Sequence, residues 1–292
     1  MLYRDRNGNE IRGNDAQDKL LEKIYKTLPG RLLLKPFTNP AVSKLAGKLL
    51  DTRLSARAIV PFVEKHQIHM SDYKGNCFRS YNDFFCREIA PGKRPIAKEG
   101  NILISPCDAK LSCYTITMEG RVKIKQTAYT LEELLMNQAL AKRFVGGQLL
   151  VFRLTVDDYH HFCYIDEGRK TRNIRIPGVL HTVNPAAGDV VPIYKENARE
   201  YSLLNSKHFG TVLMMEVGAL FVGKIVNLHE AAVVWRGQEK GHFEFGGSTV
   251  ILCLQKGKAC LDEDIIKNSA ENIETIVRMG ERIGEQIILS GY

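Results

Sequence analysis

The feature that most constrains the fold is a change in the texture of the chain near residue 101. Beyond this point, short runs rich in β-branched and aromatic residues alternate with Gly, Pro, Asp and Asn, as in ILISP, KLSCYTI, QLLVFRL and STVILCL. Apolar runs bounded by turn-forming residues are typical of β-strands. We therefore expect an α+β protein in which residues 96–292 form a domain rich in strands.

Two segments of this domain have a helical pattern. Thr130 followed by Glu133 is a capping-box signature, which predicts a helix over about 130–143. The C-terminal segment 262–286 is also expected to be helical. No repeat or low-complexity tract interrupts the domain.

Residues 1–95 form the other expected region, which is helical and basic. An Asn-Gly pair within residues 3–12 favours a hairpin. Apolar residues at helical spacing predict one helix from Asp15 to about Leu28, ended by Pro29-Gly30, and another over about 55–68.

Between these helices lies an expected amphipathic helix. Its apolar face consists of Val42, Leu45, Leu49 and Leu50, with Lys44 and Lys48 beside it. Such a helix can lie in a bilayer interface, or it can pack on a protein core. Residues 1–70 contain 13 Lys and Arg against 7 Asp and Glu, so this quarter supplies +6 of the net charge of +8. The surplus favours an anionic membrane or nucleic acid as partner, although a solvated basic face explains it equally well.

Composition disfavours several classes of protein. The chain has no run of about 18 apolar residues, so no membrane-spanning helix is expected. The polar start MLYRDRNGNE is unlike a secretory signal. The seven cysteines are scattered without a C-x-x-C pair, which favours reduced thiols in the cytosol over a disulfide framework.

The stretch GHFEFGGSTVILCL, residues 241–254, places two glycines directly before Ser248. This arrangement predicts either a tight turn into a strand or a peptide bond that the serine hydroxyl attacks. In the second case the hydroxyl attacks the Gly247 carbonyl, which Gly246 and Gly247 leave accessible, and an N→O acyl shift gives an ester. β-Elimination then breaks the chain, and the remaining dehydroalanine hydrolyses to a pyruvoyl group and ammonia.

Three other residues are candidates for proton transfer. RLTVDDYHHFCYIDEG, residues 153–168, contains His160, and strand alternation turns the neighbouring His161 to the opposite face. Asp108 in SPCDAKLS begins a predicted strand, where it can orient an imidazole. His181 in PGVLHTVNP is expected at a strand end. Each histidine can also be a hydrogen-bonded structural residue.

A metal site built from these histidines is disfavoured. The candidate ligands are His160, His161, Cys163 and His181. The first three do not share a strand face and lack known zinc spacing, so we expect no metal.

Several stretches together resemble the phosphatidylserine decarboxylase family. They follow the expected order over residues 78–284, and the combination of DYH, the G-Q-E-x-G-x-F run and the glycine-serine step is the specific part. The stretches are NDFFCREIAPGKRPI, SPCDAKL, KQTAYTLEELL, FRLTVDDYHHF, GVLHTVNP, EVGALFVGKI, RGQEKGHFEFGGSTVIL and ETIVRMGERIGE.

The resemblance implies a proenzyme that cleaves itself between Gly247 and Ser248 into a β chain, 1–247, and an α chain, 248–292. The α chain would begin with the pyruvoyl group, which forms a Schiff base with the substrate amine and accepts the electrons released as carbon dioxide leaves. By resemblance, Ser248 is the nucleophile and Asp108 the acid of an Asp-His-Ser relay for self-cleavage. His160 serves decarboxylation or substrate protonation.

Cys163 departs from the family pattern. Many members have D-Y-H-x-x-H, and the second histidine is often the relay base. A neutral thiol, with a usual pKa of about 8.5, cannot do the same work. Either His160 takes both roles, or His181 replaces the missing imidazole, which is the alternative we favour, or processing is impaired.

The expected function is that of a carboxy-lyase, peripheral on the cytoplasmic face of a membrane, which converts phosphatidylserine to phosphatidylethanolamine. Its expected partners are an anionic phospholipid membrane and, within the protein, its own α and β chains; the family also implies a homodimer. Nucleic acid is disfavoured because no aromatic-basic interleaving is found. Two alternatives stay open, an uncleaved inactive relative that binds lipid and a pyruvoyl enzyme for a soluble amino acid. The ordered motifs disfavour a plain β-domain in which Ser248 merely ends a turn.

Overall fold

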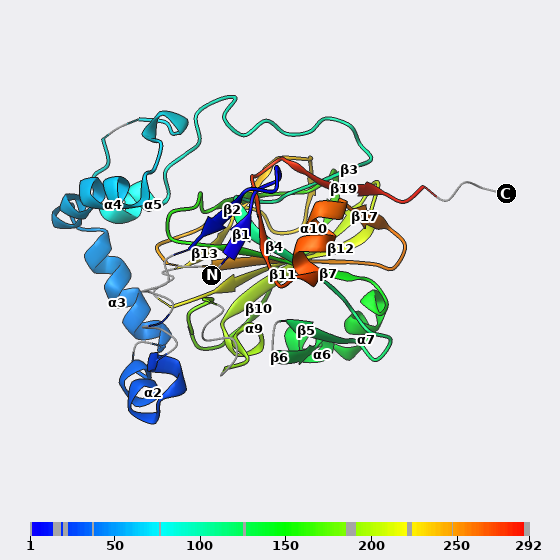
Figure 1. Ribbon diagram of the computed structural model, residues 1–292, viewed down its shortest axis with the longest axis horizontal. Coiled ribbons are helices and arrows are strands. Elements are labelled where there is room, and N and C mark those ends of the chain that lie inside the picture. The colour runs from blue at the N-terminus through cyan, green and yellow to red at the C-terminus, as the bar shows by residue number, and fades with distance from the viewer. Residues whose placement is uncertain are drawn as a thin grey trace.

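A computed structural model describes residues 2–13, 19, 23–36, 38–75, 77–124, 127–184, 191–220, 224–246 and 248–288. These residues form a mixed α/β structure that is rich in strands and has short helices (Figure 1). Gly247 lies outside the described residues. The division into domains at about residue 95 stays a prediction.

A large sheet runs through the centre of the molecule. Within the described residues it has eleven strands in the order β14-β9-β11-β12-β16-β7-β4-β18-β1-β2, with β10 paired to β11. All neighbours are antiparallel except β1 and β18, which are parallel. The strands are β1 (Leu2–Arg4), β2 (Glu10–Arg12), β4 (Ala109–Thr115), β7 (Gln148–Leu154), β9 (Gly168–Lys170), β10 (Ile174–Ile176), β11 (Arg199–Ser206), β12 (Gly210–Gly218), β14 (Ala232–Val234), β16 (Ser248–Leu254) and β18 (Glu274–Val277).

Small sheets flank the large one. Their strand orders are β13-β15-β8, β17-β19-β3 and β5-β6. The strands are β3 (Ile102–Ile104), β5 (Arg121–Ile124), β6 (Thr127–Thr130), β8 (His161–Cys163), β13 (Ile225–Asn227), β15 (Glu239–Phe243), β17 (Ala259–Leu261) and β19 (Arg282–Gln286).

Both faces of the large sheet are buried at its central strands, which explains why these strands are apolar without alternation. Phe152 of β7 and Leu252 of β16 belong to one apolar cluster. Val151 and Ile251, their neighbours along the same strands, belong to a second cluster on the other face. Strands β7 and β16 are therefore held rigidly along their whole length, and the residues at their ends have fixed positions.

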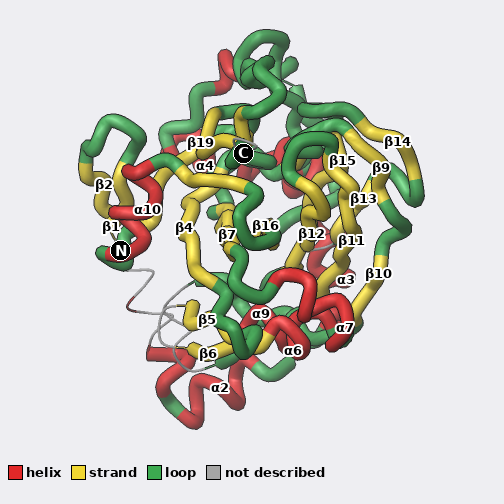
Figure 2. The backbone as a smooth tube through the Cα atoms, turned by 90° about the vertical axis from the view of Figure 1, so that its right-hand side faces the viewer, coloured by secondary structure: helices red, strands yellow, loops and turns green. Residues whose placement is uncertain are grey.

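The helices lie around the sheets. Figure 1 shows α2, α3 and α4 along one side of the molecule, and Figure 2 shows α6, α7 and α9 gathered at one end of the large sheet. Among the described helices, none has the length and apolar character needed to cross a bilayer. The α-helices are α2 (Leu28–Leu34), α3 (Pro40–Leu50), α4 (Ile59–His66), α5 (Tyr81–Phe85), α6 (Leu131–Leu135), α7 (Gln138–Ala141), α9 (Ile193–Glu196) and α10 (Glu263–Ala270), and the 3-10 helices are η1 (Arg53–Ala58), η2 (Met70–Asp72) and η3 (Lys142–Phe144).

The N-terminal expectations are confirmed in part. The hairpin over residues 3–12 is present as β1 and β2. The helix expected to end at about Leu28 ends at residue 26, but Pro29 and Gly30 do not stop helical structure, because α2 begins at Leu28 and includes both residues. Proline is tolerated in the first turn, where its missing N–H would have had no helical partner. The expected helix from Asp15 lies partly outside the described residues.

Two helix predictions in the larger domain are too long. The Thr130–Glu133 capping box forms as predicted, but α6 ends where Met136 has a left-handed φ of 50°, and α7 and η3 follow separately. The prediction of a helix over 262–286 is wrong beyond α10. Asn272 has a φ of 60° after that helix, and the segments beyond it pair as β18 and β19.

Candidate active site

Ser248 is the first residue of β16 and is completely buried. It pairs with Gly218 of β12 on one side and with Leu154 of β7 on the other. Its Oγ has no hydrogen-bond partner within the part of the chain that the structure describes. Gly246, two residues earlier, has a φ of 131°, which a residue with a side chain rarely adopts. The first glycine of the pair is therefore required by the backbone that leads into Ser248.

Asp108 immediately precedes β4, and Ser248 begins β16, so both residues lie at the same end of the central strands. Lys110, Arg153 and Thr249 form one row across β4, β7 and β16. Ser248 and Asp108 therefore lie near the same end of the sheet's strands, with β7 between them. Two strand spacings separate their backbones by about 10 Å.

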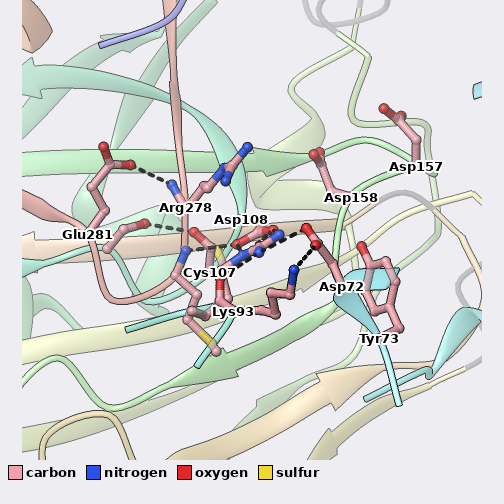
Figure 3. A network of polar contacts seen from close by, with 12 residues as sticks. Asp72, Tyr73, Lys93, Cys107, Asp108, Asp157, Asp158, Arg278 and Glu281 are labelled. Atoms are coloured by element: carbon pink, nitrogen blue, oxygen red, sulfur yellow. Dashed lines mark hydrogen bonds and ion pairs between the residues drawn. The ribbon is translucent and has the colours of Figure 1, made fainter. Parts of the chain in front are cut away.

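Arg94 holds the Asp108 carboxylate. Its Nε lies 2.8 Å from Oδ1, and its Nη2 lies 2.5 Å from Oδ2, while the Met279 N–H donates to Oδ1 at 2.8 Å. Figure 3 shows Asp108 within this network, with Asp72 and Lys93 on one side and Arg278 and Glu281 on the other. Burial disfavours the charge on Arg94, but its contacts with Asp108 outweigh this and raise its pKa. Across the described residues, Asp108 is thus bonded to an arginine and a main-chain amide rather than to a histidine.

His160 is completely buried, and the tautomer of its ring is fixed by a carbonyl. Nδ1 lies 3.0 Å from the main-chain oxygen of Asp158, which can only accept, so Nδ1 has the proton and Nε2 has the lone pair. Nε2 has no partner among the described residues. Burial, and then the charge of Arg87, lower the pKa of His160 to about 3. The ring is neutral at neutral pH, and Nε2 is available as a hydrogen-bond acceptor.

The segment that leads into Ser248 runs beside His160. The Phe243 N–H donates to the His160 carbonyl at 3.0 Å. Phe85 packs against the His160 ring at 4.1 Å and against Phe245 at 5.4 Å between centroids. These contacts bring the DYH segment and the glycine-serine step into one buried region.

Cys163 lies where the family resemblance implies a histidine. Its N–H donates to the Pro106 carbonyl at 2.8 Å, which places it beside the turn that contains Asp108. Burial, assisted by the negative charges of Asp108 and Glu239, raises the pKa of the thiol to about 12. The thiol stays protonated and cannot act as a base at neutral pH.

His181 lies in a loop, so its expected place at a strand end is wrong. Its Nε2 is 3.5 Å from a Glu196 carboxylate oxygen, and its Nδ1 is buried without a partner among the described residues. The Asn197 side chain accepts from the His181 N–H at 2.9 Å and donates to the Gly218 carbonyl at 2.7 Å. Since Gly218 pairs with Ser248, this link places the main chain of His181 on the β12 side of Ser248, whereas Asp108 lies on the β7 side.

Burial lowers the pKa of His181, and the charge of Glu196 partly offsets this. His181 therefore has a carboxylate neighbour of its own, independent of Asp108. The set His160, His161, Cys163 and His181, which was considered as a metal site above, does not form a cluster among the described residues. Only His161 of this set belongs to a group with metal-ligand spacing.

Arg87 and Arg94 were not among the predicted site residues, although both lie in the stretch NDFFCREIAPGKRPI. Arg87 is buried and donates to the carbonyl oxygens of Asp157 and Asp158 at 3.1 and 3.3 Å. The available signal was the position of the two arginines beside apolar residues and prolines, because a guanidinium that is buried there needs fixed acceptors. A cavity of about 260 Å³ lies beside Arg94 and is also lined by Cys163.

Comparisons with known proteins identify the family of the chain. The family model described as phosphatidylserine decarboxylase matches residues 81–285. A protein of Clostridium acetobutylicum named phosphatidylserine decarboxylase proenzyme 2 is 44% identical over 266 residues, which are 91% of each chain. A phosphatidylserine decarboxylase proenzyme of Clostridium novyi is 40% identical over 278 residues, 93% of this chain and 94% of the relative. The match includes the buried serine, the DYH segment and the Asp108 turn, and the chain belongs to the phosphatidylserine decarboxylase family.

Proposed function

We propose that this protein converts phosphatidylserine to phosphatidylethanolamine with a pyruvoyl group that it forms from Ser248. Family membership supports the reaction, and the proenzyme names of the relatives support self-processing. The single observation that supports the site most strongly is the buried Ser248 hydroxyl without a described partner. Leaving such a group unpaired costs about 1–3 kcal/mol, which is expected where the group is kept for chemistry.

In the proposed processing step, Ser248 Oγ attacks the Gly247 carbonyl carbon while its proton passes to an imidazole. The Oγ–C ester bond forms and the C–N bond breaks. Loss of the Ser248 Cα proton then releases Gly247 as a carboxylate, and addition of water with loss of ammonia completes the group. The positive φ of Gly246 supports this assignment, because it bends the backbone just before the bond that breaks.

We assign the base of this step to His181. Three observations support the choice: a free Nδ1, a carboxylate of Glu196 at 3.5 Å from Nε2, and the Asn197 link to the residue that pairs with Ser248. An imidazole with a carboxylate on one nitrogen and a free second nitrogen is the arrangement that activates a serine. The Asp108 carboxylate, bonded to Arg94, is assigned to positioning of the turn that faces Cys163.

In the mature protein the pyruvoyl ketone would supply an electrophile for the substrate amine and an acceptor for the electron pair left by carbon dioxide. We assign His160 to proton transfer in this reaction, since its tautomer leaves Nε2 free as an acceptor. Phe85 and the surrounding burial exclude water from that nitrogen.

The N-terminal helices are proposed to hold the protein peripherally on an anionic membrane. Leucines of α2 and α3 are 62–69% exposed, so this apolar face is not packed on the protein core. Exposed leucines beside basic residues fit the interface of a bilayer. The exposed leucines are Leu28, Leu32, Leu33, Leu45 and Leu49.

Intact mass of the purified protein under denaturing conditions tests the processing. We expect two chains whose masses sum to that of the precursor plus one water minus one ammonia. A sum of the precursor plus one water alone indicates ordinary proteolysis, and a single uncleaved chain favours an inactive lipid-binding relative. Release of carbon dioxide from phosphatidylserine in anionic vesicles, but not from free serine, then tests the substrate.

A further inference from the structure

A bulge in β15 brings Glu239 and His242 together on one side of the strand. In a regular strand, residues three apart point to opposite faces. Here the register with β8 shifts between Glu239 and Gly241, so both side chains lie beside His161, which pairs with His242. The ligand atoms of these three residues all lie within 4.8 Å of one another.

The His161 ring faces an acceptor oxygen at each nitrogen. Nδ1 lies 2.7 Å from Glu239 Oε1, and Nε2 lies 3.1 Å from the Cys86 carbonyl oxygen. A neutral imidazole has only one N–H. The other ring nitrogen of His161 then has its lone pair directed at the lone pair of an oxygen. When Nε2 has the proton and donates to the Cys86 carbonyl, the Nδ1 lone pair faces the Glu239 carboxylate, and a proton or a metal ion between them joins the two groups.

His242 distinguishes between these two cations. Its Nδ1 is 3.9 Å from the same Glu239 oxygen, is buried, and has no hydrogen-bond partner among the described residues. The His161 and His242 rings stack at 4.9 Å with an interplanar angle of 27°. A proton on His161 satisfies one contact and leaves His242 Nδ1 unpaired. A metal ion between the three side chains satisfies all of them.

We propose that His161, Glu239 and His242 bind a divalent transition-metal ion, for which Zn²⁺ fits best. Two imidazoles and one carboxylate form a known zinc ligand set, and tetrahedral ligands at about 2.0–2.2 Å from the ion lie about 3.4 Å apart. The contacts of 2.7 and 3.9 Å at Glu239 Oε1 bracket that spacing, so a small movement of its half-exposed side chain completes the site. The Cys86 carbonyl on Nε2 orients the His161 ring, as outer partners of ligating histidines do.

The ion would connect β8 to β15 next to the active site. His160 directly precedes β8, and β15 leads to the Gly246 turn. His161 and Glu239 also line the cavity of about 260 Å³, which gives the ion access and leaves its fourth position open to water. We therefore expect Zn²⁺ to stabilise the folded protein and to fix the two segments that meet at Ser248.

Metal binding can be tested without measuring decarboxylation. Purified protein is dialysed against EDTA, titrated with Zn²⁺ by calorimetry, and analysed for bound metal. We expect one equivalent of Zn²⁺ and a higher Tm. His242→Phe retains the ring stack and Glu239→Gln retains the shape of the side chain. Each substitution should weaken Zn²⁺ binding by at least roughly 10–100-fold, which is the cost of losing a residue that only hydrogen-bonds a metal ligand.

His69→Gln, which removes an exposed histidine outside the cluster, is the matched control and should bind Zn²⁺ as the wild type does. The proposal is overturned if the wild type binds no Zn²⁺ after removal of EDTA, or if His242→Phe and Glu239→Gln both bind it undiminished. Should His242→Phe fail to fold, Glu239→Gln decides, because the Glu239 side chain is 46% exposed.

Discussion

Arg87 and His160 donate to the same main-chain oxygen, that of Asp158, from 3.3 and 3.0 Å. This shared acceptor fixes the proton of His160 on Nδ1 and holds a permanent cation close to the ring. Arg87 is itself confined by the faces of Tyr73 and Phe84, at 4.3 and 4.8 Å from the ring centroids. The result is a neutral buried imidazole whose free nitrogen is available to a reacting group.

The first prediction concerns stability against pH. His160 has a pKa of about 3 in the folded chain and of about 6.5 when unfolded, so the unfolded state binds its proton first. Its contribution to stability is full above pH 6.5 and is lost as the pH falls toward 3, by at most about 1.4 kcal/mol per pH unit. Urea unfolding of an uncleaved Ser248→Ala chain should show this slope, and adding His160→Gln should reduce it.

The control for this measurement is His69→Gln in the same Ser248→Ala chain, because His69 is exposed. Its pH slope should equal that of the parent. An equal slope for His160→Gln and the parent would mean that His160 is not the group responsible.

The second prediction concerns the Arg94–Asp108 pair, whose side chains are 7% and 10% exposed. Arg94→Met leaves an unpaired buried carboxylate, which is expected to cost about 3–5 kcal/mol in the free energy of unfolding. Adding Asp108→Asn should recover part of the loss. Lys74→Met breaks the exposed pair with Glu88 and should cost about 0–1 kcal/mol. Equal losses in Arg94→Met and Lys74→Met would contradict the positioning role.

The strands around Ser248 could be predicted because their signal is local. Strand β16 is apolar at nearly every position since both faces of the sheet are covered, and the runs are too short for helices. The failure over 262–286 has the opposite cause. Strand β18 is formed by pairing with β4 on one side and with β1 on the other, where Tyr3 lies opposite Glu274, and no local pattern indicates partners so distant in sequence.

The candidate site shows the same division. Ser248, Asp108, His160 and His181 could be selected from motifs and residue chemistry. The partners that decide their roles, Arg94, Arg87 and Glu196, depend on tertiary contacts that spacing does not reveal. The bulge that joins Glu239 to His242 is likewise a property of pairing with β8.

The third prediction concerns Gly246, whose φ of 131° favours glycine. Gly246→Ala should destabilise the uncleaved chain by about 1–3 kcal/mol and slow cleavage before Ser248, because the strained turn must relax. Chain cleavage is followed by electrophoresis after synthesis. Gly75→Ala is the matched control, since Gly75 has a φ of 72° and open space around its Cα. Unchanged cleavage in Gly246→Ala would show that this bend is dispensable.

The fourth prediction separates the two histidines. His181→Ala should slow cleavage at Ser248 by about 10²–10⁴-fold, the usual contribution of a general base. Glu196→Gln should slow it less, because it removes only the carboxylate that lies 3.5 Å from His181 Nε2. His160→Ala should still cleave but should decarboxylate slowly, and His69→Ala should do both normally. Each variant is followed by intact mass and by carbon dioxide release. Normal cleavage in His181→Ala with loss of cleavage in His160→Ala would assign the base to His160, and His181 would then serve only to connect the Asn197 loop to the β12 side of Ser248.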